Sequence, residues 1–192
     1  MLTPQVLAAQ QHYYGRAARL ADAPARDSLT EEEQTFIAAR DSFYMATISE
    51  SGWPYIQHRG GPKGFLQVLD PHTLAFTDYA GNRQLLSTGN LATNDRVTLF
   101  LMDYPKRERL KLLGQARVLD AREHSELAQR LHPSEFKPTK PERIFIVDVV
   151  SFDWNCPKFI TPRFTSEEVE AVVGPLRQRI SELEEKLSRQ KG

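Results

Sequence analysis

The sequence predicts a mainly β (α+β) protein, built as an antiparallel barrel or sandwich with peripheral helices. Six or seven short apolar segments lie between residues 43 and 150, and turns of hairpin length separate most of them. Helical patterns do not alternate regularly with these segments, which argues against a doubly wound parallel sheet. One segment, residues 110–119, alternates apolar and polar side chains as a half-buried antiparallel strand does.

Size and composition suit one globular domain with a real core. The chain has 192 residues, of which 40% are hydrophobic and 26% charged. Its 25 basic residues balance 25 acidic ones, so we expect neither nucleic acid nor a membrane as a partner. The single cysteine, Cys156, cannot form an internal disulfide, and no secretory signal or apolar 18-residue run is visible, so we expect a cytoplasmic protein.

The first 34 residues form an N-terminal helical segment. A helix is expected from Thr3 to Arg19, with Pro4 in its first turn. After a linker, Thr30 and Glu33 match a capping box, which predicts a short helix to about residue 40.

The strands follow in order along the chain. We expect them at residues 43–49, 55–59, 65–69, 74–78, 96–102, 110–119 and 144–150. The last is continuously apolar, which favours a central strand buried on both faces. In residues 110–119, one face carries Leu110, Leu112, Gly114, Ala116 and Val118. Helical stretches are expected at residues 83–91 and 121–131.

Residues 161–192 form a C-terminal helix of different character. Apolar residues recur there at heptad spacing, at Val169, Val173, Leu176, Ile180, Leu183 and Leu187. Gly174-Pro175 interrupts the helical pattern, so we expect a kink or two helices. The stripe either packs on the chain's own barrel or pairs with a partner chain, and the spacing does not choose between the two.

Several common functional motifs are absent from the sequence. There is no P-loop, no dinucleotide-binding GxGxxG and no GxSxG nucleophile motif. The five histidines lack metal-ligand spacing, so no metal site is expected. Cys156 has no neighbouring base and is not expected to act as a nucleophile.

Two segments are suited to binding an anion. Residues 57–64 place Arg59 and Lys63 among three glycines at a strand end, although a solvated hairpin would look similar. Residues 81–84 would open a helix after a strand, with Asn82 as N-cap and Arg83 beside it, although a plain capped helix is equally consistent. Together, the two segments would suit one phosphate.

Two further residues are ambiguous. Arg109 lies in a charged cluster that could simply be surface. Trp154 follows the last strand and could stack on a flat ring or fill the core, which is the commoner role of an aromatic side chain.

Five motifs in this order resemble those of the pyridoxamine 5′-phosphate oxidase-like flavoproteins. They are Gly52-Trp-Pro-Tyr-Ile-Gln-His-Arg59, Gly60-Gly-Pro-Lys-Gly-Phe65, Phe76-Thr-Asp-Tyr79, Gly81-Asn-Arg83 and Arg109-Leu-Lys-Leu-Leu-Gly114. Each is weak alone, but the set is fairly specific and covers residues 35–160. The resemblance implies a six-stranded antiparallel split β-barrel and a homodimer with FMN at the interface.

The resemblance also implies a set of cofactor-binding residues. Gln57, His58, Arg59, Gly60 and Lys63 would lie along the flavin and its phosphate. Phe76 and Thr77 would touch the ribityl chain or phosphate, and Asn82, Arg83 and Gln84 would hold the phosphate. Arg109 would approach the flavin from the next strand, and Trp154 would come from the partner chain.

Two departures from the family pattern bear on the substrate. Pyridoxamine 5′-phosphate oxidases end in a basic R-x-H-x-R-like segment, whereas this chain continues from Trp154 to Arg163 without it. Gly60-Gly61 also replaces an apolar run. We therefore expect an FMN-dependent oxidoreductase with another, unknown substrate and a small-molecule electron donor or acceptor. The alternatives are a sensing module for flavin or another cofactor such as haem, without turnover, and a dimeric scaffold. No catalytic acid or base is assigned.

Overall fold

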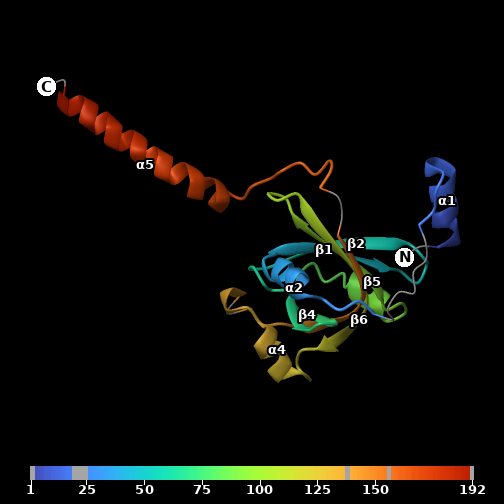
Figure 1. Cartoon of the computed structure of the whole chain (residues 1–192). Coiled ribbons are helices and arrows are strands. Elements are labelled where there is room, and N and C mark those ends of the chain that lie inside the picture. Colours follow the sequence, from blue (N-terminus) through green and yellow to red (C-terminus); the bar gives the residue numbers. More distant parts are fainter. Residues whose placement is uncertain (1–2, 19–25, 137–138, 155–156, 191–192) are drawn as a thin grey trace.

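The computed structural model describes residues 3–18, 26–136, 139–154 and 157–190. It shows a curled antiparallel sheet flanked by short helices, with one long helix projecting from the body (Figure 1). The helices are α1 (Pro4–Tyr14), α2 (Glu31–Ala38), α3 (Leu86–Leu91), α4 (Ser125–Leu131) and α5 (Ser166–Gln190), with a 3₁₀ turn at Ser134–Phe136. The strands are β1 (Ser42–Ile48), β2 (Pro54–Gly60), β3 (Gln67–Asp70), β4 (Thr73–Asp78), β5 (Arg96–Asp103), β6 (Glu108–Asp120) and β7 (Arg143–Trp154).

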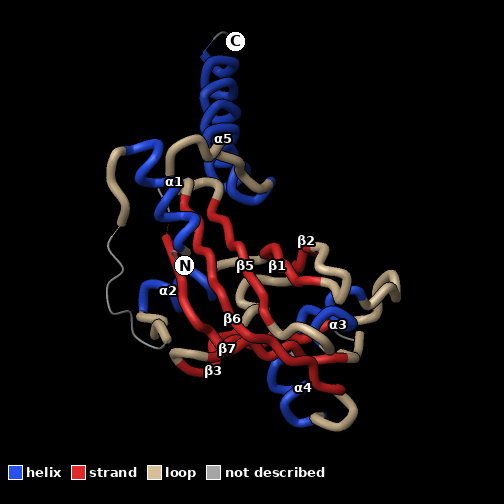
Figure 2. Tube along the Cα trace, turned by 90° about the vertical axis from the view of Figure 1, so that its right-hand side faces the viewer, coloured by secondary structure: helices blue, strands red, loops and turns tan. Residues whose placement is uncertain are grey.

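The sheet has seven strands in the order β2-β1-β5-β6-β7-β4-β3 and is not closed (Figure 2). This corrects the expected six-stranded barrel. Residues 61–66 leave the sheet after β2, and Phe65 and Leu66 turn into the core, so the expected strand at 65–69 begins only at Gln67. Within the described residues, β2 and β3 form no ladder; an ion pair between Arg59 of β2 and Asp78 of β4 links the two sides instead.

The two longest strands, β6 and β7, run antiparallel through the middle of the sheet. The expected inward face of β6 is confirmed, since Leu110, Leu112, Gly114 and Ala116 are all buried. The ladder shifts register between Leu113 and Gly114. A Cβ at Gly114 would lie 2.7 Å from the carbonyl oxygen of Asp148, so this close approach of the strands requires glycine.

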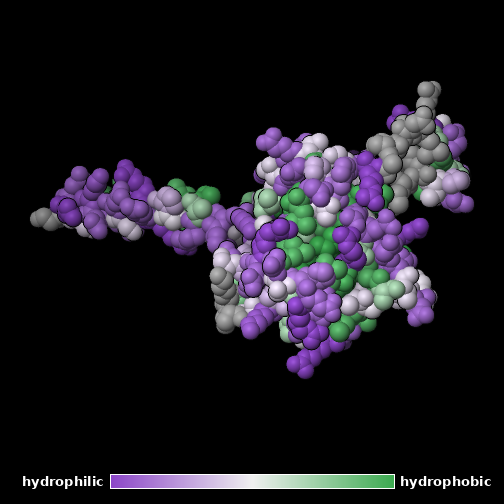
Figure 3. All heavy atoms as spheres, turned by 90° about the horizontal axis from the view of Figure 1, so that it is seen from below, coloured by the Kyte–Doolittle hydropathy of each residue, from purple (hydrophilic) through white to green (hydrophobic). Residues whose placement is uncertain are grey.

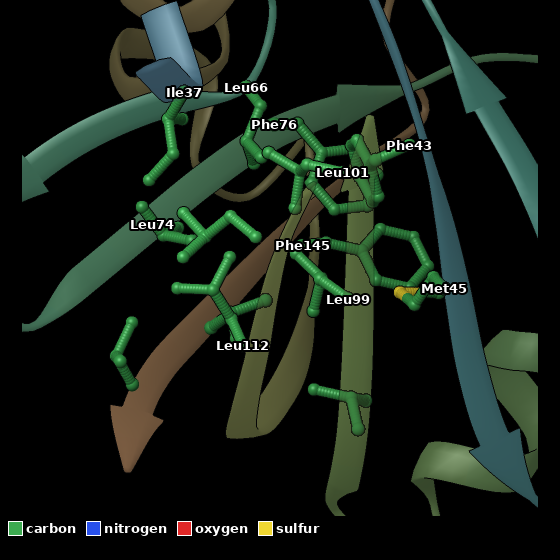
Figure 4. Packing of buried hydrophobic residues seen from close by; sticks show 14 of the residues in the cluster. Ile37, Phe43, Met45, Leu66, Leu74, Phe76, Leu99, Leu101, Leu112 and Phe145 are labelled. Carbon is green, nitrogen blue, oxygen red and sulfur yellow. The ribbon is translucent and has the colours of Figure 1, made fainter. Parts of the chain in front are cut away.

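The core lies inside the curl of the sheet (Figure 4). Phe76 and Phe145 stack with ring centroids 4.9 Å apart, and Phe43 meets Phe76 edge-on at 5.3 Å. Residues 144–147 of β7 are all buried, which confirms the expected central strand for that stretch.

The N-terminal helices follow their capping signals. The capping box of Thr30 and Glu33 is formed, and the helix it begins is α2. α1 ends at Tyr14, earlier than expected, because Gly15 adopts the left-handed conformation (φ 66°) and donates its N–H to the carbonyl of Gln11. Arg19, the expected end, lies outside the described residues.

Two other helices are shorter than expected. α3 begins at Leu86 rather than Arg83, and Asn82 is not its N-cap, because the Asn82 carboxamide oxygen accepts the Gln84 N–H at 3.1 Å in a local turn. α4 begins at Ser125, after turns over residues 121–124.

α5 is a single helix with Pro175 inside it, rather than two helices. It extends away from the body, and none of its residues is buried (Figure 1). The chain's own barrel therefore does not cover the heptad stripe in this structure. Although α5 has 25 residues, no helix in the described ranges is apolar and long enough to cross a membrane.

Candidate functional site

A small polar pocket lies between β2, the loop after β4 and the start of α3. Its volume is about 210 Å³. Five of the predicted site residues line it, together with Arg143 at the start of β7; the five are Gln57, Arg59, Asn82, Arg83 and Gln84. The structure thus brings the two anion-suited segments of the sequence together.

The alternation of β2 decides which of its residues reach the pocket. Tyr55, Gln57 and Arg59 are partly buried and line it. Ile56 and His58 are exposed, because successive side chains of a strand point to opposite faces. His58 instead packs edge-on against Tyr44 of β1, with ring centroids 5.5 Å apart.

Asp78, at the end of β4, holds two arginines in place. Its Oδ1 pairs with Arg59 Nη1, and its Oδ2 accepts from Arg143 Nε at 2.7 Å. Arg59 also lies 4.9 Å from the centroid of the Phe145 ring. Burial lowers the pKa of Arg59, and the Asp78 carboxylate partly opposes this shift. The Arg59 Nε is buried without a hydrogen-bond partner among the described residues.

The pocket lining has an excess of positive charge. Among the described residues, the pocket is lined by three arginines, Arg59, Arg83 and Arg143, and by one carboxylate, that of Asp78. Arg143 pairs on its other side with Glu142, which is about half exposed and does not line the pocket. The pocket is therefore suited electrostatically to an anion with several acceptor oxygens.

The loop after β4 carries backbone strain. Arg83 and Leu85 adopt positive φ values of 59° and 53°, which non-glycine residues rarely do. The Ser87 hydroxyl donates to Gln57 Oε1 at 2.9 Å and ties the start of α3 to β2. Strained residues held in this way cluster at ligand sites.

Sequence reasoning missed Asp78 and Arg143 as site residues. Asp78 stands within the Phe76–Tyr79 motif, but nothing local shows that its carboxylate joins two strands. The pairing arises because β4 lies beside β7, with Asp78 opposite Arg143 in the register.

Several predicted site residues lie outside the pocket. Gly60 and Lys63 do not line it. Phe76 is 1% exposed within the core. Thr77 is buried, and its hydroxyl is 2.8 Å from the Tyr79 hydroxyl, which in turn lies 2.8 Å from His132 Nδ1.

Arg109 and Trp154 lie away from the pocket in the same chain. The Arg109 guanidinium lies 5.4 Å from the centroid of the Phe100 ring, and its buried Nε has no partner among the described residues. Trp154 packs edge-on against Phe36 at 4.7 Å and donates its indole N–H to Glu33 at 2.7 Å. Its expected contribution to a partner chain's site stays a prediction. Cys156 lies outside the described residues.

The pocket fits the phosphate end of FMN but not the whole cofactor. Its excess of positive charge and the unpartnered Arg59 Nε suit phosphate oxygens. Its volume of about 210 Å³ is below the 300–1,000 Å³ typical of sites for whole ligands of drug size. A larger groove shares Thr88 and Arg143 with the pocket, so there is further space beside it for a ring system.

The sequence is similar to that of a known protein family. The sequence model of the pyridoxamine 5′-phosphate oxidase family matches residues 29–150, more than half of the chain. No curated protein matches it closely enough to inform its function.

Solved structures share the fold at low sequence identity. The Group A Streptococcus protein HupZ is 15% identical with a TM-score of 0.54, over 71% of this chain and 99% of that one. A Lactobacillus delbrueckii protein classed provisionally as a pyridoxamine 5′-phosphate oxidase is 20% identical with a TM-score of 0.50, over 66% of this chain and 93% of that one. At such identities, these likenesses show the fold alone, whereas the family match, together with the order of motifs from Gly52 to Gly114, shows that the chain belongs to the pyridoxamine 5′-phosphate oxidase family.

Proposed function

We propose that this protein binds FMN, with the phosphate in the cationic pocket, and works as an FMN-dependent oxidoreductase. The observation that carries the proposal is the convergence of Arg59, Arg83 and Arg143 on one pocket, in which Asp78 is the one lining carboxylate among the described residues. An excess of positive charge next to a strained loop favours a bound anion.

The three arginines of the pocket and Lys63 have separate proposed roles. Arg59 and Arg143 are held in place by Asp78, so their donors are oriented before a ligand arrives. Arg83, which is exposed, would close on the phosphate from the loop. Lys63 is proposed as a cation near the flavin ring, where positive charge stabilises the reduced anion. FMN itself would supply the electron or hydride transfer.

A second copy of the chain would complete the site. Tyr44, Ile48 and Ile56 are 41%, 37% and 65% exposed on β1 and β2, and apolar strand faces of this kind favour burial against a partner. The unpartnered Nε of Arg109, on β6 two strands from β1, would gain a polar partner there. Arg109 and Trp154 stay in the proposed site as residues that reach a flavin at such an interface.

The first test is the visible spectrum of the purified protein, followed by boiling and identification of the released cofactor. Flavin bands and released FMN would support the proposal. A colourless protein that also fails to take up added FMN would overturn it, and uptake of another cofactor, such as haem, would favour the alternative of a binding module.

Binding without turnover is the second candidate function, and the pocket gives a reason to test it. Among the described residues, the pocket lining contains no histidine or cysteine, and its one carboxylate is fully engaged by two arginines. Steady-state oxidation of a reduced nicotinamide by the FMN-loaded protein would support an oxidoreductase. FMN binding without any such turnover, over a panel of electron acceptors, would support a sensing module.

A further inference from the structure

We propose that α5 pairs with α5 of a second copy of this chain as a parallel, two-stranded coiled coil. This inference does not rest on FMN binding. It starts from the exposure of the heptad stripe: Leu176, Ile180 and Leu187 are 59%, 55% and 54% exposed, and no residue of the helix is buried. In Figure 3 the body carries a hydrophobic patch, whereas the visible face of α5 is mostly hydrophilic. The exposed large apolar residues of α5 belong to the heptad stripe, apart from Val172.

The residue types in the stripe favour two parallel strands. The 4,3,4,3,4 spacing assigns Val173, Ile180 and Leu187 to heptad position a, and Val169, Leu176 and Leu183 to position d. Two of the three a positions are β-branched, and two of the three d positions are leucine, a combination that favours parallel dimers. Pro175 falls at position c and Gly174 at position b, both away from the seam, so the helix breaker does not interrupt the contact face.

The flanking charges favour the parallel arrangement. In a parallel coil, position g of one helix faces position e of the next heptad in the other. Arg179, at position g, would then face Glu184 of the second chain, at position e. Because the coil has two-fold symmetry, this attractive pair would form twice. In the separate chain Arg179 contacts Glu182 at 3.0 Å, an exposed pair that can be exchanged at little cost.

The antiparallel alternative brings like charges together. In an antiparallel coil with the two stripes fully overlapped, Ile180 of one helix would pack against Leu176 of the other. In this register, g positions face g positions and e positions face e positions. Arg179 would then face Arg179, and Arg177 would face Arg177. Glu184 would meet Glu170. Each flanking charged pair would be repulsive, so the charge pattern selects the parallel orientation.

A membrane surface fits the helix less well than a second copy. α5 carries six glutamates against four basic residues, and its stripe contains no aromatic residue. Helices that lie on anionic membranes have a basic polar face and aromatic anchors.

Cysteine crosslinking of the full chain tests the proposal. In a Cys156→Ser background, Leu187→Cys places a thiol in the seam near the C-terminus, and the matched control Gln178→Cys places one on the outer face. In a parallel coil the two 187 positions are adjacent, whereas in the antiparallel register they lie about 27 Å apart. We expect Leu187→Cys to form disulfide-linked dimers at least about tenfold faster than Gln178→Cys. Equal rates, or no crosslinking of either, would overturn the proposal.

Exchanging the charges at positions 179 and 184 provides a second test, which leaves the apolar a and d positions unchanged. Glu184→Arg, added to the Leu187→Cys protein, should slow crosslinking by about tenfold because Arg179 would then face a cation. Adding Arg179→Glu should restore the rate. An unchanged or accelerated rate in the single variant would overturn the proposal.

Truncation after Arg163 separates this inference from pairing through the barrel. A truncated chain that remains dimeric in solution, combined with the crosslinking difference in the full chain, would show that the coil adds to a barrel interface. A truncated monomer with the same crosslinking difference would make the coil the element of assembly. Either result supports the coil, and neither depends on flavin occupancy.

Discussion

The two ends of β7 use similar side chains in different ways. At Trp154, polar groups are satisfied within the chain: the indole N–H bonds to Glu33, and nearby Arg40 bonds to Asp103 at 2.7 Å and to the Met102 carbonyl at 3.0 Å. At Arg143, three guanidinium groups line a pocket with one carboxylate, and Arg59 keeps an unpartnered Nε. Polar groups that are balanced internally stabilise a fold, whereas an excess of one charge leaves capacity for a ligand.

Arg109 is an exception to this contrast. It lies on β6, where the neighbouring Leu110 is paired with Trp154, yet its buried Nε lacks a partner, as does that of Arg59.

The largest expected effect is at the packed end. Trp154→Ala should lower the free energy of unfolding by about 3 kcal/mol, because it removes the ring packed on Phe36 and the indole donor to Oε1 of the buried Glu33. Chemical denaturation measures this loss. The control is Trp53→Ala, at a residue that is 76% exposed, where we expect a change within about 0.5 kcal/mol. Equal effects of the two substitutions would contradict the packing role, and altered flavin fluorescence in the folded variant would add a cofactor contact.

At the pocket, Asp78→Asn should lower the free energy of unfolding by about 2–3 kcal/mol, because Arg59 loses its carboxylate partner and Arg143 keeps only the half-exposed Glu142. Phosphate or FMN should raise the melting temperature of this variant more than that of the native protein, since a bound anion replaces the missing charge. Thermal unfolding with and without ligand measures both effects. The control is Asp153→Asn, at an exposed carboxylate that pairs with Lys111 and lines neither the pocket nor the larger groove. If the ligand raised the melting temperatures of the native protein and the Asp78→Asn variant equally, the anion would not be bound beside Asp78.

Arg83→Ala should weaken FMN binding by about 1.5–3 kcal/mol, about tenfold to 150-fold in Kd, if its guanidinium holds the phosphate. Fluorescence titration of the apoprotein measures this change. Arg130→Ala, at an exposed arginine of α4 that lines neither the pocket nor the larger groove, should leave Kd unchanged. Unchanged flavin occupancy in the Arg83 variant would remove Arg83 from the site.

The smallest effect is a pH dependence at Glu33. Burial acts to raise the pKa of this carboxyl, but hydrogen bonds from Thr30 and Trp154 outweigh it and hold the pKa below its usual value. The ionised form therefore stabilises the fold above the unfolded pKa of about 4.3, and this contribution is lost as the pH falls through the folded pKa. Glu33→Gln should flatten the fall in stability between about pH 6 and pH 3, measured by denaturation at each pH. Identical slopes for both proteins would show that Glu33 does not contribute.

The sequence by itself determined the local elements and the main cluster of the site. The capping box at Thr30 and the alternation over residues 110–119 involve residues close together in the chain, so their consequences can be read from spacing alone. The heptad spacing of α5 is readable for the same reason. The motifs holding Arg59 and Arg83 supplied both sides of one pocket because each motif sits beside an apolar run that predicts a strand.

The tertiary structure alone decided how distant segments meet. Whether the sheet closes depends on the path of residues 61–66, in which Phe65 and Leu66 enter the core instead of extending a strand. Asp78 joined the site because strand order and register set it opposite Arg143, and the location of Trp154 under α2 depends on a contact with Glu33, 121 residues away in the chain. Side-chain partners across a sheet follow from long-range pairing, which local spacing does not encode.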